Sequence, residues 1–231
     1  MEESRLKDSE RIVTITRVER VERQAGRYTI HFDGAAPLEV HEDVMIKFRL
    51  LKGSELSLDS LTEILRADEG NKAYVQAIKY LQRKPRTRIE LARNLAQKGY
   101  EDGIVHEVLD RLEREWLVDD KSYAMQWAHQ RLNRHMKGRR WIQHELKQKG
   151  VQDRHIETAL YSIDPEEEWE SALHAARKKW RQTKGEMHLR KQKVAAFLAR
   201  RGFPMDMARR AAYAAADEQV DEEGVSGHLD E

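Results

Sequence analysis

The hexapeptide LAQKGY at residues 95–100 recurs in altered form as LKQKGV at 146–151 and as LARRGF at 198–203. The three copies carry glycines spaced 51 and 52 residues apart, at Gly99, Gly150 and Gly202. A period of this size is typical of repeat proteins, in which each repeat forms one supersecondary unit. The spacing therefore predicts three equivalent structural units, and the hexapeptide marks the same place in each.

Each copy of the hexapeptide has the features of a helix stop. A glycine just past a helix adopts the left-handed conformation without steric cost. The apolar residue after the glycine then folds back onto the leucine that lies four positions before the glycine. The residue preceding each glycine is basic (Lys98, Lys149 and Arg201), which suits the negative end of the helix dipole. We therefore predict that a helix ends at each of the three glycines.

The apolar residues around each glycine recur with the period of an α-helix. Positions +6, +9, +10 and +13 after the glycine, and position −8 before it, are apolar in all three units. Each unit is therefore predicted to contain three helices in about fifty residues, and neighbouring units are expected to stack because one unit is too small to bury its own apolar face. The downstream positions are Val105, Val108, Leu109 and Leu112, then Ile156, Ala159, Leu160 and Ile163, then Ala208, Ala211, Ala212 and Ala215.

The first fifty residues differ from the rest, because RIVTITRVERVE and RYTIHF alternate apolar and polar residues. This pattern predicts an antiparallel β element of two or three strands. The expected fold is thus mainly α, with three tandem three-helix repeats in an elongated array and a small N-terminal β element. The predicted boundaries are 1–56 for the β-containing segment, 57–70 for a connecting helix, 71–119, 120–164 and 165–216 for the repeats, and 217–231 for an acidic disordered tail.

The net charge of +1 conceals an uneven distribution. Residues 217–231 hold seven acids and no Lys or Arg, so residues 1–216 carry a net charge of +8. Within this body, residues 177–210 contain twelve Lys or Arg and two acids. Such a body predicts a polyanionic partner or an acidic protein surface. A solvated helical array without any such partner has the same composition, and the charge alone leaves both possibilities open.

The sequence contains no pattern that indicates catalysis. There is no cysteine, no GxSxG, Walker or GxGxxG motif, and no HExxH spacing among the ten histidines. The paired acids Asp119 and Asp120 precede a predicted helix, where they are expected to cap free amides. Most of the Trp residues are expected in the core, with Trp141 in GRRWI as the exception. We therefore expect a protein that is not an enzyme and that binds no metal or cofactor.

The chain has no run of eighteen apolar residues and no secretory signal at its charged N-terminus. A cytoplasmic protein, not bound to a membrane and monomeric, is the expectation.

One set of basic residues requires a separate explanation. Arg88, Arg139 and Lys191 each lie eleven residues before a repeat glycine, and the first two fall in a predicted first helical turn. A cation there opposes the helix dipole at a cost of a few tenths of a kcal/mol, so a partner surface is a candidate explanation.

Five quoted features together resemble the RecX regulatory proteins of bacteria, over about residues 73–214. They are RKPRTRIELARNLAQKGY, LVDDKSYA, Arg131, GRRWIQHELKQKGV and FLARRGF. Lys84 stands where an arginine is common in the family, and Tyr123 where a phenylalanine often occurs. The resemblance implies three tandem three-helix repeats. It also implies a regulator of recombination and DNA repair that binds RecA recombinase and the RecA–DNA filament, and usually inhibits strand exchange and ATP hydrolysis. The predicted contacts to RecA or the DNA backbone are Arg86, Arg88, Arg131, Lys137, Arg139, Arg140, Lys147 and Lys191.

The alternative is a tandem helix–turn–helix-like protein that binds nucleic acid directly. LARNLAQKGYEDGIVHEVL has a glycine between two predicted helices, as in DNA-reading motifs. However, DGIVHEVLDRLERE, in the position of the recognition helix, has more acids than bases. Sequence-specific reading by the first repeat is therefore not expected, whereas weak phosphate contact elsewhere stays open.

Overall fold

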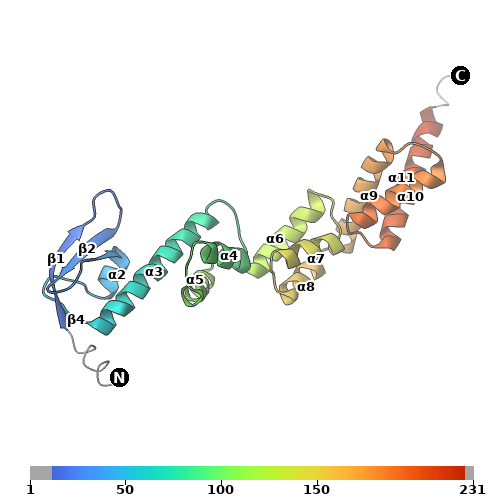
Figure 1. Cartoon of the computed structure of the whole chain (residues 1–231). Helices are drawn as coiled ribbons and strands as arrows, with labels where there is room; N and C mark the ends of the chain where they lie inside the picture. Colours follow the sequence, from blue (N-terminus) through green and yellow to red (C-terminus); the bar gives the residue numbers. More distant parts are fainter. Residues whose placement is uncertain (1–11, 227–231) are drawn as a thin grey trace. The chain divides into compact units, whose positions relative to one another are not determined.

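A computed structural model describes residues 12–226, with side chains described as far as residue 218 (Figure 1). This part of the chain divides into two compact units. The N-terminal unit consists of residues 12–84 and 91–117, and the C-terminal unit of residues 85–90 and 118–226.

A four-stranded antiparallel sheet begins the N-terminal unit, with the strands in the order β3-β2-β1-β4. Its strands are β1 (Ile12–Arg20), β2 (Arg27–Phe32), β3 (Leu38–His41) and β4 (Glu55–Ser57). The sequence predicted two or three strands, and this number is corrected to four. The missing strand, β4, pairs with only the first three residues of β1, and three residues are too few to show an alternating pattern.

The sheet packs against α2 (Glu42–Lys47) and the long helix α3 (Leu58–Leu81). A hairpin alone is marginally stable in water, and burial against helices supplies the apolar contacts that it lacks. The buried core of this part consists of Val13, Ile15, Ile30, Phe32, Val40, Val44, Leu50 and Ile64.

Helix α3 crosses the predicted boundary between residues 70 and 71. The expected connecting helix and the first helix of the first repeat are therefore one helix of 24 residues. Gly70 does not interrupt it, because a single glycine in a helix costs only about 1 kcal/mol. Polar groups hold this region to β2 and to α2: the Arg27 guanidinium of β2 donates to the buried Asp68 over 2.6 Å, and the Asn71 amide donates to Asp43 of α2 over 3.1 Å.

Three three-helix repeats follow, as predicted. The C-terminal part of α3 is followed by α4 (Arg88–Gln97) and α5 (Asp102–Arg114). Of the twelve downstream positions predicted to be apolar and core-facing, eleven are buried and Leu160 is half-buried. The second repeat contains α6 (Asp120–Asn133), α7 (Arg139–Gln148) and α8 (Asp153–Tyr161), and the third contains α9 (Pro165–Gln182), α10 (Met187–Arg200) and α11 (Met205–Ser226).

The three repeat glycines end their helices as the sequence predicts. Their φ angles are +89°, +75° and +92° for Gly99, Gly150 and Gly202. The amide of the residue after each glycine donates to the carbonyl of the leucine four positions before the glycine, over 3.3, 3.1 and 3.2 Å. This is the hydrogen-bond pattern of a glycine-terminated helix, and it satisfies carbonyl groups that the helix leaves free.

Two of these glycines also join one repeat to the next within the C-terminal unit. The Gly138 amide donates to the carbonyl of Arg201 over 2.9 Å, and the Thr87 hydroxyl donates to the carbonyl of Lys149 over 2.7 Å. A Cβ atom on Gly202 would lie 2.3 Å from the backbone nitrogen of Trp141, and one on Gly150 would lie 2.7 Å from the Cβ of Ile89. The helix stop of each later repeat thus packs directly on the second-helix start of the repeat before it.

The predicted disordered tail is partly helical. Helix α11 continues to Ser226, ten residues past the expected end of the third repeat at 216. The Arg177 guanidinium on α9 donates to both carboxylate oxygens of Glu218, over 2.5 and 2.6 Å. The alanines before residue 217 favour helix, and no glycine or proline intervenes to stop it before Gly224. The expectation of disorder is therefore wrong for residues 217–226, while 227–231 lie outside the described range.

Candidate partner-binding surface

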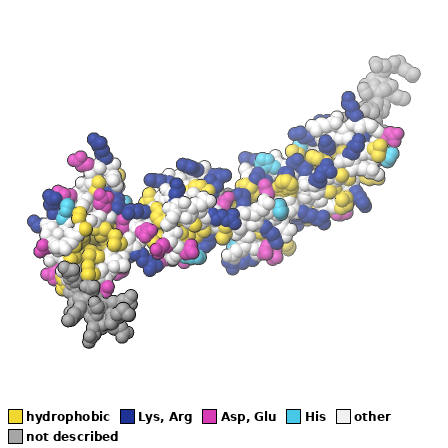
Figure 2. Space-filling model, viewed as in Figure 1, with side chains coloured by type: hydrophobic (Ala, Val, Ile, Leu, Met, Phe, Trp, Pro, Cys, Tyr) yellow, Lys and Arg dark blue, Asp and Glu magenta, His cyan; other side chains and the backbone are white. Residues whose placement is uncertain are grey.

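All eight basic residues predicted to contact a partner belong to the C-terminal unit. Arg86 and Arg88 belong to it because residues 85–90 pack with residues 118–226. Lys and Arg side chains cover much of the visible face around α9 and α10 (Figure 2). In the structure, some of the eight predicted residues form ion pairs and hydrogen bonds within the protein, whereas others face solvent.

Arg131 belongs to an aromatic cluster within the second repeat. Its guanidinium lies 4.0 Å from the centroid of the Trp127 ring and donates to Glu145 over 2.7 Å. The Trp127 indole N–H donates to the same carboxylate oxygen over 3.1 Å. The Lys149 amino group lies over the same Trp127 ring, 4.4 Å from its centroid. Arg131 is therefore largely occupied by contacts within the fold.

Lys149 also forms an ion pair across the junction between repeats. Its Nζ donates to Glu90 over 3.0 Å, and Arg86 reaches the same carboxylate oxygen at 4.0 Å. Burial alone would lower the pKa of Lys149, but hydrogen bonds to Tyr123 and Glu90 outweigh it and raise the pKa. The amino group therefore stays charged. The sequence assigned Lys149 only to the helix dipole, and its cross-repeat ion pair was not predicted.

The proposed column of basic residues at the second-helix starts is partly structural. The Arg139 guanidinium donates to the buried Glu168 over 2.6 Å and to the carbonyl of Ile163 over 2.9 Å. This pairing supplies the local reason for a cation that the sequence did not reveal, so the argument for a partner contact fails at Arg139. The Arg88 amide donates to Asp120 over 2.9 Å in the equivalent place, so Asp120 caps the start of α4.

The third member of the column, Lys191, is not in a first helical turn, because α10 begins at Met187. Its Nζ lies 3.5 Å from Asp217 and 4.3 Å from the centroid of the Tyr213 ring. The dipole argument therefore does not apply to Lys191.

The predicted cap at Asp119 is confirmed, since its carboxylate accepts from the Ser122 amide over 3.0 Å.

Three predicted residues lie on one solvent-facing part of the second repeat, Lys137, Arg140 and Lys147. The Lys137 amino group lies 3.2 Å from the centroid of the Trp141 ring, which is 38 % exposed. Burial, followed by the charge of Arg201, lowers the pKa of Lys137. Arg140 is exposed, and Lys147 is half-exposed beside Asp153 at 3.1 Å. We call Lys137, Arg140, Trp141 and Lys147 the α7 face.

Sequence reasoning missed a second basic group, where α6 ends beside α9 and α10. A cavity of 330 Å³ there is lined by Arg134, Lys178, Lys179 and Arg201, among others. The excess of basic residues over 177–210 was visible in the sequence. It could not show that Arg134, more than forty residues earlier, would join them, because that depends on how the repeats stack.

The Trp residues follow the expected division except at one position. Trp180 is 2 % exposed in the core, whereas Trp116 is 83 % exposed and has a positive φ.

Among residues 12–226, no three His, Asp or Glu side chains are placed to hold a metal ion. In the same part of the chain, no helix is long and apolar enough to cross a membrane.

Comparison with known proteins identifies the three repeats individually. Residues 73–112, 119–160 and 166–212 match the first, second and third three-helix domains of RecX. The regulatory protein RecX of Geobacillus kaustophilus (strain HTA426) is 36 % identical over 200 residues, which cover 84 % of this chain and 74 % of that protein. Its counterpart in Limosilactobacillus reuteri (strain DSM 20016) is 34 % identical over 190 residues, which cover 82 % and 72 %.

Solved structures agree with these sequence matches. A crystal structure of regulatory protein RecX superposes with a TM-score of 0.74 at 32 % identity, covering 84 % of this chain and 96 % of that one. RecX from Lactobacillus salivarius superposes with a TM-score of 0.60 at 26 % identity, covering 64 % and 97 %. The glycine-terminated repeats, their order and these likenesses lead to one conclusion. The chain belongs to the RecX family of regulatory proteins.

Proposed function

We propose that the protein regulates homologous recombination by binding RecA and its DNA filament, and that it inhibits RecA strand exchange and ATP hydrolysis. The observation that carries this proposal is the match of all three repeats, in order, to the three domains of RecX. The action is stoichiometric binding, with no catalytic step. Because RecA works on chromosomal DNA, the proposal places the protein in the cytoplasm, and we expect it to act as a monomer.

The α7 face is the part of the predicted surface that we assign to the partner. Lys137, Arg140 and Lys147 present positive charge beside the partly exposed Trp141. Trp and Arg are enriched at protein interfaces, which favours the pair Arg140 and Trp141 as the centre of the α7 face. Arg139 is left out because Glu168 already binds it, and Arg131 because Glu145 and Trp127 do.

Sequence-specific DNA reading by the first repeat is not favoured. Helix α5 lies where a recognition helix would be, but its Arg111 donates to Glu115 over 2.7 Å and stacks on Tyr74 at 3.8 Å. Its Glu107 is paired with Arg66 at 2.6 Å. A helix whose charges are engaged in this way, and which carries several acids, offers few donors to base edges.

Binding to RecA-coated and to bare single-stranded DNA separates the proposal from simple DNA binding. Fluorescence anisotropy of the labelled protein, titrated with each ligand at increasing salt, gives both affinities. We expect the RecA-coated strand to bind more tightly, and to keep binding at salt concentrations that release bare DNA. Equal affinities for coated and bare DNA at every salt concentration would contradict the proposal.

The same titration tests the α7 face. The variant K137Q/R140Q/K147Q should bind the RecA filament less tightly. The matched control R20Q/K52Q/K79Q removes three exposed cations of the N-terminal unit and should bind as the wild type does. Both variants change the net charge equally, so a difference between them reports position rather than total charge.

A further inference from the structure

We propose that a basic groove between the second and third repeats binds the backbone phosphates of single-stranded nucleic acid. We call it the α9 groove. It is lined by Arg134, His135 and Met136 at the end of α6, by Ala175, Lys178, Lys179 and Gln182 of α9, and by Phe197 and Arg201 at the end of α10. The inference deepens the proposed function, on which it rests for its setting, by giving the filament's DNA a contact site on this chain.

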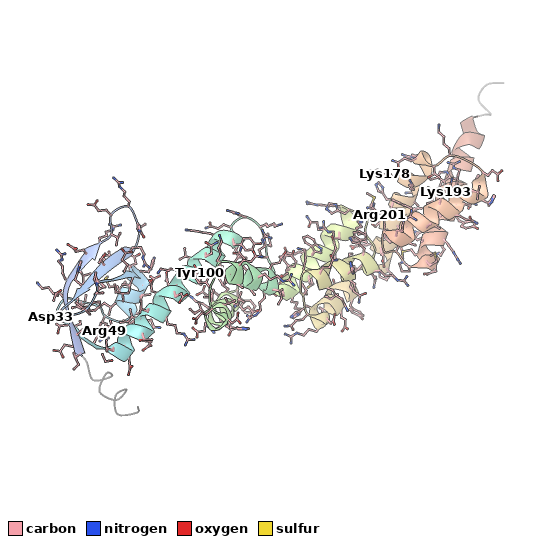
Figure 3. The ribbon with its side chains drawn as sticks, in the orientation of Figure 1. Asp33, Arg49, Tyr100, Lys178, Lys193 and Arg201 are labelled. Carbon is pink, nitrogen blue, oxygen red and sulfur yellow. The ribbon has the colours of Figure 1, made fainter. Side chains whose placement is uncertain are left out.

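The charge of the α9 groove is of one sign. Four of its nine lining residues are Lys or Arg, and none is Asp or Glu. Lys178 and Arg201, which come from different elements, are labelled in Figure 3 with Lys193 of α10 close by in this view. Helix α10 itself contains no acid between Met187 and Arg200.

The helix dipole favours a cation at three of these four positions, because Arg134 and Arg201 are the C-cap residues of α6 and α10 and Lys179 lies in the last turn of α9. The dipole does not neutralise their charges. The Arg201 guanidinium donates to the carbonyls of Met136, over 2.8 Å, and His135, and so satisfies the end of α6. The structure gives Arg134, Lys178 and Lys179 no acidic partner among residues 12–218. Arg134 and Lys178 are exposed. Three cations in and beside one groove therefore exceed what capping of α6 requires.

The charge of Arg201 also acts on a second cation at the same junction. The charge of Arg201 adds to the effect of burial in lowering the pKa of Lys137, on the same junction. Cations that raise each other's energy in this way are stabilised when an anion binds between them, because the added negative charge relieves the repulsion.

The chemistry of the lining favours phosphates over an acidic protein segment. An amphipathic helix needs exposed apolar anchors in its groove. Here Ala175 is buried, and the Phe197 ring has Lys179 at 5.5 Å and Arg201 at 5.3 Å over it. Because the lining offers cations and one half-buried ring that Lys179 and Arg201 already contact, we expect recognition to involve phosphates and to be independent of base sequence.

Salt dependence gives the proposal a quantitative test. For single strands, each phosphate neutralised by a cation contributes roughly 0.7 to the slope of log affinity against log salt concentration. If Arg134, Lys178 and Lys179 each contact a phosphate, neutralising all three should reduce the slope by about 2. The probe is a labelled oligothymidylate without RecA, measured by anisotropy between about 50 and 200 mM salt.

The test compares the full-length wild type with R134Q/K178Q/K179Q, and with the control R20Q/K52Q/K79Q of equal charge. We expect the groove variant to bind at least about tenfold more weakly at the lowest salt concentration and to show the reduced slope. The control should keep the wild-type slope. Oligothymidylate and oligoadenylate should bind alike, and a duplex of equal length more weakly because it cannot enter the groove.

Several outcomes would overturn the inference. One is a groove variant, with normal circular dichroism, whose affinity and slope equal those of the wild type or fall no further than those of the control. Another is competition by polyglutamate as strong as by oligothymidylate of equal charge, which would indicate an acidic protein partner. If the triple variant melts early, the single variants K178Q and R134Q decide, since both residues are exposed.

This test and that of the proposed function can fail separately. A groove variant that loses DNA binding but still inhibits RecA fully leaves the proposed function standing without this contact. A wild type that binds oligothymidylate with the expected slope but leaves RecA unaffected would refute the proposed function alone.

Discussion

Arg139 and Glu168 form an ion pair between the second and third repeats, with Nε 2.6 Å from Oε2, and the Arg139 amide donates to Oε1 over 3.1 Å. The carboxylate thus caps the start of α7 and neutralises the cation that begins it. An acid placed at residue 139 would face the buried Glu168. Charge reversal there would destabilise the fold, so it cannot serve as a neutral test of partner binding.

We predict that Glu168→Gln destabilises the protein, because Arg139 then loses its charged partner while remaining partly buried. Removing one partner of a fully buried pair costs about 3–5 kcal/mol, and the partial exposure of Arg139 reduces the expected loss to about 1–3 kcal/mol. Urea denaturation measures it. The control Glu166→Gln changes an exposed acid on the same helix and should cost less than about 0.5 kcal/mol. Equal losses for both variants would mean that the ion pair contributes nothing specific.

The repeat glycines should differ in their tolerance of alanine. All three have a positive φ, so each substitution brings conformational strain of about 1–2 kcal/mol. Gly99→Ala meets no atom within 4 Å and should show this strain alone. Gly202→Ala should cost clearly more, because its Cβ would collide with the Trp141 backbone. Thermal melting measures the stability of both variants. Equal losses of melting temperature would argue against the close approach of Gly202 to the Trp141 backbone.

Gly138→Ala separates packing from backbone strain. Gly138 has an ordinary φ of −79°, so alanine fits its backbone conformation. A Cβ there would nonetheless lie 2.5 Å from the backbone of Gly202 and Phe203. We therefore expect a substantial loss of thermal stability from a substitution that is harmless to the local backbone. A melting temperature equal to that of the wild type would show that the junction can open without cost.

The N-terminal unit should lose stability in acid through Asp68. Burial alone would raise the pKa of this carboxyl, but hydrogen bonds from Arg27, Lys72 and the His41 amide outweigh it and lower the pKa. A carboxyl with a lowered pKa stabilises the fold above its unfolded value of 3.8, and this contribution is lost as pH falls through the folded value.

The variant Asp68→Asn should therefore be less stable than the wild type at neutral pH, with the difference shrinking below 3.8. Calorimetric melting of both proteins across this pH range measures the difference. Asp59→Asn, an exposed acid in the first turn of the same helix, is the control and should show a much smaller difference. A stability gap for Asp68→Asn that does not depend on pH would show that its charge is not involved.

Removing residues 217–231 should affect binding more than folding. The deletion ends the ion pair between Arg177 and Glu218, which lies at the surface and is worth about 0–1 kcal/mol. It also takes away seven acids, so the remaining chain has a net charge of +8. We expect a small change in melting temperature and tighter binding to oligothymidylate at low salt. A large loss of helicity beyond the deleted residues would show instead that the end of α11 supports the third repeat.

The sequence predicted those parts of the fold that depend on neighbouring residues. A glycine past a helix end, a leucine four residues before it and the apolar residue after it form a local motif, and all three copies were confirmed by φ and hydrogen bonds. Thr87 and Glu90 form an equally local motif at the start of α4, in which the Thr87 amide donates to the Glu90 carboxylate and the Glu90 amide donates to the Thr87 hydroxyl oxygen.

The errors concern relations between distant residues. Glu168 lies 29 residues from Arg139 and belongs to another repeat, so no spacing rule could pair them. The sequence did not predict that the connecting helix and the first helix of the first repeat form one continuous helix, α3, through Gly70. The helix over residues 217–226 was not predicted because the acidic composition of 217–231 was taken to indicate disorder, whereas the alanines before residue 217 favour continuation of α11.

The most direct test of the proposed function is RecA ATP hydrolysis on single-stranded DNA, titrated with this protein. We expect the rate to fall as the wild type is added, with weaker inhibition by the α7-face variant K137Q/R140Q/K147Q and unchanged inhibition by R20Q/K52Q/K79Q. Matching circular dichroism melts would establish that all three proteins are folded. A folded wild type that leaves the rate of ATP hydrolysis unchanged at every ratio to RecA would contradict the account.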